Sequence, residues 1–242
     1  DGCAFEECIS LETINLPDSV TELGGSVFYK CSKLKEINIP DKTTSIGHSA
    51  FNGCSGLESI VIPKTVEKLN YYTFLNCTSL KHLSIPAGIN ISKNTFSGCT
   101  ALNDIVITAG SEHGYQDDFS NKDYYRYDLP WYCLDNDMSI TIKHGVTKIP
   151  DYMLDECRNI VSLIFPSSVN TLTKLEFEDC SNIEYLEIPM GINIQKDAFE
   201  GCKSLKYFTI IEGKNTDYRN YSSPDDSLDY LPWNQIEDDA NT

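Results

Sequence analysis

The residues whose types and spacing best suit chemistry are a histidine and an aspartate, His82 and Asp104. They hold the same position in two consecutive copies of a repeated phrase. If those copies form adjacent strands, the two side chains lie about 5 Å apart. A His–Asp pair suits acid–base catalysis or metal binding. Ser84 is near in sequence, but nothing places it convincingly as a nucleophile, so a surface ion pair is the favoured interpretation.

A second candidate is the acidic run Asp135-x-Asp137-x-Ser139, which has the first three alternating oxygen ligands of a calcium loop. It lacks the glycine expected at the sixth position, where Ile140 stands, and the glutamate expected at the twelfth. A solvated acidic loop is favoured over a calcium site. The chain has no phosphate-binding glycine loop, nucleotide fingerprint or paired catalytic carboxylates. We therefore expect neither an enzyme nor a cofactor.

The cysteines follow a regular spacing. Cys8, Cys31, Cys54 and Cys77 are 23 residues apart and Cys99 follows after 22, a pattern that returns at Cys157, Cys180 and Cys202. One cysteine per repeat at a constant phase predicts a column of reduced, buried thiols, because free cysteine packs as a small hydrophobe. Cys3 and Cys133 lie off this column. No Cys-x2-Cys or His-x3-His pair favours zinc.

The cysteines belong to a longer repeated phrase, whose cleanest copy runs from Phe51 to Pro63. Other copies are Phe28–Pro40, Phe74–Pro86 and Phe177–Pro189, with looser ones at Phe5–Pro17, Phe96–Thr108, Leu154–Pro166 and Phe199–Ile211. A period in this range predicts a solenoid of stacked units. In each unit we expect one short parallel strand and a return segment that is briefly helical or extended. The nine strands centre on Ile14, Ile37, Ile60, Leu83, Ile105, Ile140, Leu163, Leu186 and Phe208.

The pattern Ile-Pro-x-x-Val-x-x-Ile-x-x-x-x-Phe-x-x-Cys-x-x-Leu resembles the BspA-like, or treponemal-type, leucine-rich repeat. The resemblance covers most of the chain. It implies a leucine-rich-repeat solenoid: a right-handed curved coil of ~23-residue repeats, with a parallel concave β-sheet and little regular helix. It also implies a secreted or cell-surface protein of bacteria or of some protists, often linked to adhesion to host matrix proteins.

Residues 1–242 are expected to form one domain, with two stretches that depart from the repeat. One is an aromatic and acidic insertion at 109–138, and the other is a C-terminal segment at 212–242 that shares its Leu-Pro-Trp motif. We expect each motif to dock on the solenoid, with Trp131 and Trp233 covering apolar edge. Packing and capping are favoured over ligand binding. Because Asp1 opens inside a repeat, a longer parent protein is also expected.

The formal net charge of −17 argues against nucleic acid or an anionic membrane surface as a partner. No apolar run approaches the length of a membrane span, and no signal peptide is visible.

Two columns of outward strand residues form the predicted contact surface. The hypothesis is a non-catalytic, adhesin-like extracellular module that binds a host or other extracellular protein. One alternative is carbohydrate binding, in which Tyr124, Tyr125, Tyr127 or Trp131 stacks on sugar rings; another is a structural spacer. A plain solvated sheet face also remains open, as does the oligomeric state. The candidate ligand-binding residues are Glu36, His82, Asp104, Val106, Ile164, Tyr185, Glu187, Tyr207, Tyr124, Tyr125 and Trp131.

Overall fold

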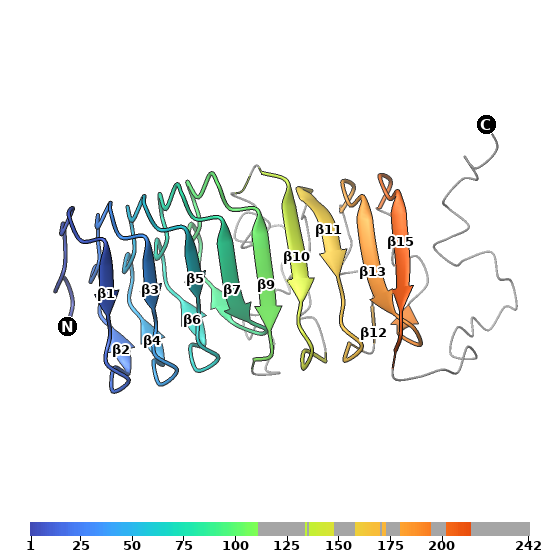
Figure 1. The fold of residues 1–242 in the computed structure, drawn as a ribbon, viewed down its shortest axis with the longest axis horizontal. Coiled ribbons are helices and arrows are strands. Elements are labelled where there is room, and N and C mark those ends of the chain that lie inside the picture. The colour runs from blue at the N-terminus through green and yellow to red at the C-terminus, as the bar shows by residue number, and fades with distance from the viewer. Residues whose placement is uncertain are drawn as a thin grey trace, which may run out of the picture.

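The chain winds into one elongated coil in which each repeat adds a rung beside the previous one (Figure 1). The structure is a computed structural model that describes residues 1–110, 134, 136–147, 158–169, 171–172, 180–194 and 202–213. No helix occurs among these residues, and none of them forms a helix that could cross a membrane.

The front row of parallel strands, one from each rung, forms two hydrogen-bonded ladders of two and seven strands. Each strand contains one of the nine apolar positions predicted from the repeat. Equivalent positions pair in register, for example Ile14 with Ile37 and Leu186 with Phe208. The predicted leucine-rich solenoid is confirmed. In chain order the strands are β1 (Thr13–Asn15), β3 (Glu36–Asn38), β5 (Ser59–Val61), β7 (His82–Pro86), β9 (Asp104–Thr108), β10 (Met138–Ile142), β11 (Ile160–Ile164), β13 (Tyr185–Pro189) and β15 (Tyr207–Ile211).

A second row of two-residue strands lies on the return path of the rungs. It forms one ladder of four strands and one of two, all parallel. The return segment is extended only over these two residues per rung, and the part that follows, as in Phe74 to Leu80, is a series of turns in which the Cys77 amide donates to the Phe74 carbonyl at 3.1 Å. These strands are β2 (Glu22–Leu23), β4 (Ser45–Ile46), β6 (Lys68–Leu69), β8 (Asn90–Ile91), β12 (Thr171–Leu172) and β14 (Asn193–Ile194).

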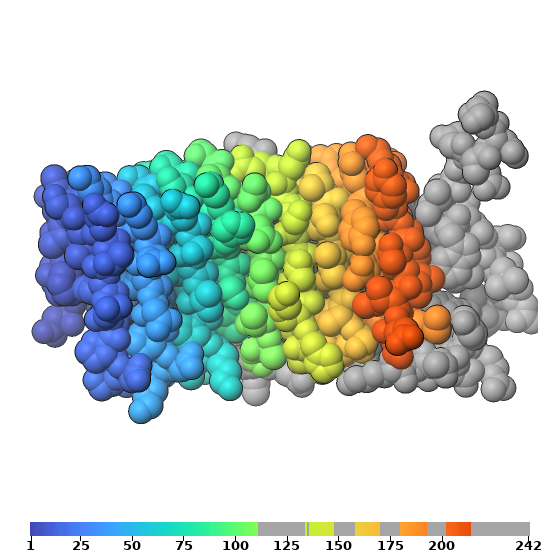
Figure 2. All heavy atoms as spheres, in the orientation of Figure 1, coloured from blue at the N-terminus to red at the C-terminus, as the bar shows by residue number. Residues whose placement is uncertain are grey.

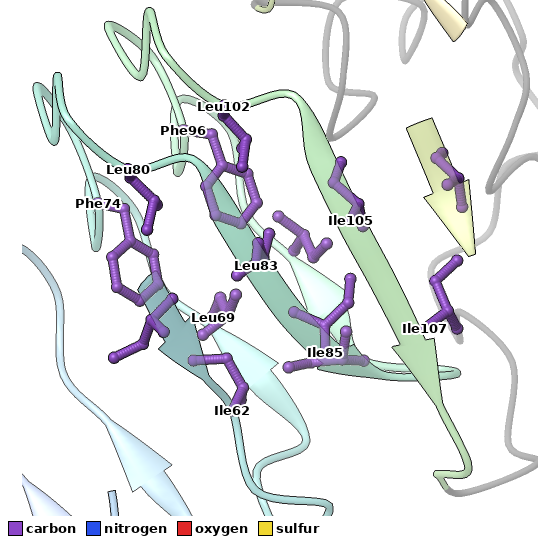
Figure 3. Packing of buried hydrophobic residues seen from close by; sticks show 14 of the residues in the cluster. Ile62, Leu69, Phe74, Leu80, Leu83, Ile85, Phe96, Leu102, Ile105 and Ile107 are labelled. Atoms are coloured by element: carbon purple, nitrogen blue, oxygen red, sulfur yellow. The ribbon is translucent and has the colours of Figure 1, made fainter. Parts of the chain in front are cut away.

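Side-chain alternation explains why each front strand has one face toward the core and one face toward solvent. In β5, Ile60 is buried whereas Ser59 and Val61 are exposed, and Ile62 beyond the strand is buried again. The inward residues of successive rungs meet in a single core, as the close view of Leu83, Ile85, Ile105 and Ile107 shows (Figure 3).

A stack of phenylalanine rings runs along this core. The five rings have centroids 5.3–5.7 Å apart and interplanar angles of 4–19°, so each ring lies almost flat on the next. Each ring buries part of its surface against the ring of the neighbouring rung, so the stack stabilises the contact between adjacent rungs. Its members are Phe5, Phe28, Phe51, Phe74 and Phe96.

The cysteine column lies beside the phenylalanine stack. The Cys54 thiol donates a hydrogen bond to the Phe28 carbonyl oxygen of the preceding rung at 3.1 Å, and the Cys31, Cys77 and Cys99 thiols repeat the contact. The prediction of reduced, buried thiols is confirmed for Cys31, Cys54, Cys77, Cys99, Cys180 and Cys202.

Cys8 corrects that prediction, because its side chain is exposed, as is that of Cys3. Cys8 lies in the first rung, which packs on a neighbour on one side alone in this chain. Cys133 and Cys157 lie outside the described residues.

Each early rung turns a corner at a residue with positive φ. The positions are Ser26, Ser49, Tyr72 and Asn94, with φ between 52° and 61°. The residue missing from the 22-residue spacing that ends at Cys99 falls after the turn Pro86 to Ile89, since this turn is as long as Pro63 to Val66 in the preceding rung. Pro86 to Ile89 forms a turn with Gly88 at φ 80°, and the pairing offset falls from 23 at Leu83 to 22 at Ile91. Glycine suits this position because it adopts positive φ without steric cost.

The predicted insertion at 109–138 connects two neighbouring strands, β9 and β10. Ile105 pairs with Ile140, a separation of 35 residues against 23 between Ile60 and Leu83, so this rung is 12 residues longer. Of its last part, Leu134 is buried, and the Asn136 amide donates to the Thr100 carbonyl at 2.7 Å. Residues 111–133, which include Trp131, and residue 135 lie outside the described residues, as do 214–242.

Candidate functional site

The surface that we call the sheet face consists of the outward side chains of the front strands. Figure 2 shows this side of the molecule as one continuous surface on which the rungs follow in chain order. One column contains Thr13, Glu36, Ser59, His82, Asp104, Ser139, Ser162, Tyr185 and Tyr207. The other contains Asn15, Asn38, Val61, Ser84, Val106, Thr141, Ile164, Glu187 and Thr209.

The candidate residues that lie on the strands all belong to this face, spread along its length in separate groups. Glu36 lies near one end, His82, Asp104 and Val106 in the middle, and Ile164, Tyr185, Glu187 and Tyr207 toward the other end. The candidates of the insertion, Tyr124, Tyr125 and Trp131, lie outside the described residues.

His82 and Asp104 form the predicted surface ion pair. They are direct partners on β7 and β9, and His82 Nδ1 lies 2.8 Å from Asp104 Oδ2. The side chains are 60% and 40% exposed, so solvent screens the interaction. Ser84 projects from the neighbouring column of the same face rather than between the two groups. No cluster of three potential metal ligands occurs in the described part of the chain.

Two tyrosines and a glutamate gather at the other end of the sheet face. Tyr185 and Tyr207 are direct partners on β13 and β15, and Tyr207 is 64% exposed. The Tyr185 hydroxyl donates to Glu187 Oε2 at 2.9 Å, which fixes both side chains on one strand. An exposed aromatic ring beside a fixed carboxylate is a typical contact for another protein, because tyrosine combines apolar area with a polar end.

The second column alternates apolar and polar residues along the middle of the face. Val61, Val106 and Ile164 are separated by Ser84 and Thr141. Val61 is 64% exposed, whereas Val106 and Ile164 are half-buried. Apolar side chains therefore recur at every second rung, about 10 Å apart. Such isolated apolar contacts within a polar field resemble the composition of a non-obligate protein interface.

Three of the buried cysteines are held as thiols. Burial raises the pKa of Cys54 to about 12 and that of Cys202 to about 12, and burial likewise raises the pKa of Cys77 well above its ordinary value. These three thiols stay protonated near neutral pH, and only the thiolate is reactive.

The residues that sequence reasoning missed are Tyr71 and Tyr72, which are 54% and 43% exposed. They follow β6 at a corner of the rung and lie outside both columns of the sheet face. A signal was present in the repeat, because the equivalent residues of the flanking rungs are His48 and Ser49, then Lys93 and Asn94. Aromatic residues replace polar ones in this rung alone among the rungs of 1–110.

Comparison with known proteins agrees with the repeat. The sequence profile of the BspA type leucine rich repeat region matches residues 2–125 and 132–223, with six copies. No curated protein matches the chain significantly.

Similar solved structures include two leucine-rich repeat proteins and a pneumococcal vaccine antigen. The chain covers 56% of a leucine-rich repeat protein from Bacteroides ovatus, with 86% of its own length matched, 20% identity and a TM-score of 0.51. It matches the T. pallidum leucine rich repeat protein over 80% of its own length and 78% of that chain, at 23% identity and a TM-score of 0.41. It matches the pneumococcal vaccine antigen PcpA over 84% of its own length and 42% of that chain, at 20% identity and a TM-score of 0.46.

The chain spans little more than half of the B. ovatus protein, and at this identity the likeness is one of fold. The repeat profile covers most of the chain, and the front strands recur every 22 or 23 residues on each side of the longer rung between β9 and β10. The chain belongs to the BspA-type leucine-rich repeat family.

Proposed function

We propose that this chain is a non-catalytic, extracellular, adhesin-like module that binds another protein through its sheet face. The observation that carries the proposal is the group formed by Tyr185, Glu187 and Tyr207, where two tyrosines are direct strand partners and the first is hydrogen-bonded to the carboxylate. Tyrosine is one of the residue types enriched among the few residues that dominate binding energy in protein interfaces. The rest of the sheet face, with Val106, Ile164 and the His82–Asp104 pair, extends the contact along the coil.

The insertion at 109–138 is part of the proposed site. Its two ends are the adjacent strands β9 and β10, in the middle of the sheet. Tyr124, Tyr125 and Trp131 are proposed to add aromatic contacts to the same partner. A location at the cell surface or outside the cell fits a family represented here by bacterial leucine-rich repeat proteins.

The test measures binding of the intact chain to a panel of immobilised extracellular-matrix and serum proteins by biolayer interferometry. For any protein that binds, we expect the double variant Tyr185→Ala/Tyr207→Ala to weaken affinity at least about tenfold, because loss of a hot spot exceeds roughly 1.4 kcal/mol. The variant Thr13→Ala/Asn15→Ala, at the other end of the face, is the matched control and should bind normally.

Unchanged affinity in the tyrosine variant, with loss in a Trp131→Ala/Tyr124→Ala variant, would move the site to the insertion. Absence of binding to every protein on the panel would favour the spacer interpretation. Circular dichroism of each variant confirms that the coil is intact before its affinity is compared.

A further inference from the structure

We propose a carbohydrate-binding site at the corner formed by Asn70, Tyr71, Tyr72 and Thr73, with Tyr71 and Tyr72 as the platform on which a pyranose ring stacks. The corner follows β6, in the second row of strands, and is separate from the sheet face. This inference does not depend on the function proposed for that face.

The first argument is the backbone conformation of Tyr72. Its φ is 61°, in the left-handed region that bulky residues rarely adopt. The equivalent corners use Cys3, Ser26, Ser49 and Asn94, so the turn of the coil itself imposes this conformation, and asparagine in particular tolerates it. A bulky tyrosine is a costly choice for such a corner, so the backbone of the turn does not account for its presence.

The second argument is that the corner is firmly fixed. The Thr73 hydroxyl donates to the Asn70 carbonyl at 2.7 Å, and the Asn70 side-chain amide donates to the Ile46 carbonyl at 2.7 Å. The Tyr71 carbonyl accepts a hydrogen bond from the Ser49 amide of the preceding rung at 3.1 Å. The two tyrosines thus project from a rigid turn, so little ordering is required when a ligand binds.

The third argument concerns the two rings. Their centroids are 6.4 Å apart, their planes are tilted by 48°, and the side chains are 54% and 43% exposed. The His48 ring lies over Gly25, because a β-carbon on that glycine would come within 2.7 Å of His48 Cε1. The histidine of the preceding rung therefore leans away from Tyr71 and toward the first rung.

The surroundings of the pair favour a sugar over a protein. The flanking corners present Ser49 on one side and Lys93 and Asn94 on the other, all capable of hydrogen bonding. The remaining exposed large apolar residues of the described chain, Ile9, Val61, Tyr207 and Ile210, belong to other parts of the coil. A protein contact needs a broad surface such as the sheet face, whereas two rings apart from other exposed apolar residues match a pyranose, which offers one apolar face and a rim of hydroxyls.

The test compares the intact chain with the double variant Tyr71→His/Tyr72→Ser on an array of neutral and acidic oligosaccharides. This variant copies the residues of the preceding rung, so the corner should fold as His48 and Ser49 do. We expect the intact chain to bind a subset of the array and the variant to lose at least about tenfold in affinity. The variant Ile9→Thr, which removes an exposed apolar side chain from the first rung, should retain the sugar affinity.

A second measurement separates a binding role from a structural one. Tyr72→Asn should raise Tm by about 2–4 °C, since asparagine accepts positive φ more readily, while sugar binding is lost. A lower Tm would mean that the Tyr72 ring supports the fold, and it would overturn the proposal. Silence of the intact chain across the array, or equal sugar binding by the double variant, would overturn it as well. If the intact chain binds sugars but no protein on the panel, the proposed protein-binding function fails while the sugar site stands. The failure of either proposal can therefore be distinguished from that of the other.

Discussion

Single residues in this coil take their role from the rungs on either side. The Cys77 side chain is buried, and its thiol donates a hydrogen bond to the Phe51 carbonyl oxygen of the preceding rung at 3.1 Å. Cysteine fits because it combines the volume of a small apolar side chain with one weak donor. Each of these cysteines therefore fills space in the core and also forms a hydrogen bond to the preceding rung.

Replacing Cys77 with alanine should lower the free energy of unfolding by about 1–2 kcal/mol, because a cavity forms and the contact to Phe51 is lost. Urea denaturation followed by circular dichroism measures the change. Cys8→Ala, at the exposed cysteine of the first rung, is the control and should change stability by less than about 0.5 kcal/mol. Equal effects would contradict a role for the buried column.

The buried thiols also predict a dependence on alkaline pH. Burial raises the pKa of Cys54 in the folded chain to about 12, above the ordinary value of 9.0. The folded state therefore binds more protons than the unfolded state between these values, and stability falls as pH rises through this window. We expect Tm to decline more steeply above pH ~9 in the intact chain than in Cys54→Ala. Parallel curves for the two proteins would refute the assignment.

The sequence predicts the contacts and exposure of a residue well on the strands of the coil, but poorly in the first rung and at the corners. The His82–Asp104 contact followed from the repeat phase, because equal positions in adjacent rungs must meet. The exposure of Cys8 was not predicted from the repeat. The position of a residue within the repeat does not show whether its rung has a neighbour on both sides. Tyr71 and Tyr72 were missed because strand periodicity does not describe the corners.

Among the elements, the rung edges carry a column of alternating charge. Glu12, Lys35, Glu58 and Lys81 lie on successive rungs and are joined by backbone hydrogen bonds. Lys35 Nζ lies 3.3 Å from Glu12 Oε2, and both side chains are more than half exposed. A shift of one rung would pair like charges, so alternation favours the observed stacking order.

The variant Lys35→Glu places three acidic residues in a row and should lower Tm by about 1–3 °C. The cause is repulsion between exposed charges, so the loss should be smaller in about 1 M NaCl, where the Debye length is short. Differential scanning calorimetry at low and high salt measures both effects. Lys35→Gln is the matched control, and the same loss from glutamine would show that repulsion is not the cause.

The elements themselves were predicted unevenly. The front strands were located correctly because their apolar centres recur with a constant period. The two-residue strands β2, β4, β6 and β8 were not assigned, because so short a segment becomes a strand only through pairing with the next rung. In β11 the register shifts between the pairs Met138–Ile160 and Ser139–Ser162, and Val161 is the extra residue. A bulge of this kind leaves no mark on the repeat pattern.

At the scale of the whole molecule, stability is the sum of rung and interface contributions. A central rung has neighbours on both sides, and its apolar residues are fully buried; Leu83 is 1% exposed. The first rung packs on one side, and Ile14 is half-buried. The same truncation should therefore cost more in the middle of the coil.

We expect Leu83→Ala to cost about 3 kcal/mol and Ile14→Ala about 1 kcal/mol or less. Hydrogen exchange of the native chain should show protection that rises from the first rung toward β7 and β9. Comparable losses for the two variants, or uniform protection, would indicate a single cooperative unit in place of a gradient.

The hydrogen bonds between successive rungs also determine how the coil responds to a pulling force. Backbone hydrogen bonds join rung to rung along the long axis (Figure 1), so tension between the two ends loads them directly. Rungs would then detach one at a time, and each 23-residue unit would add about 75 Å of chain. An object held by this coil would stay attached while the coil lengthens in steps, and each step would dissipate work before the contact itself is strained.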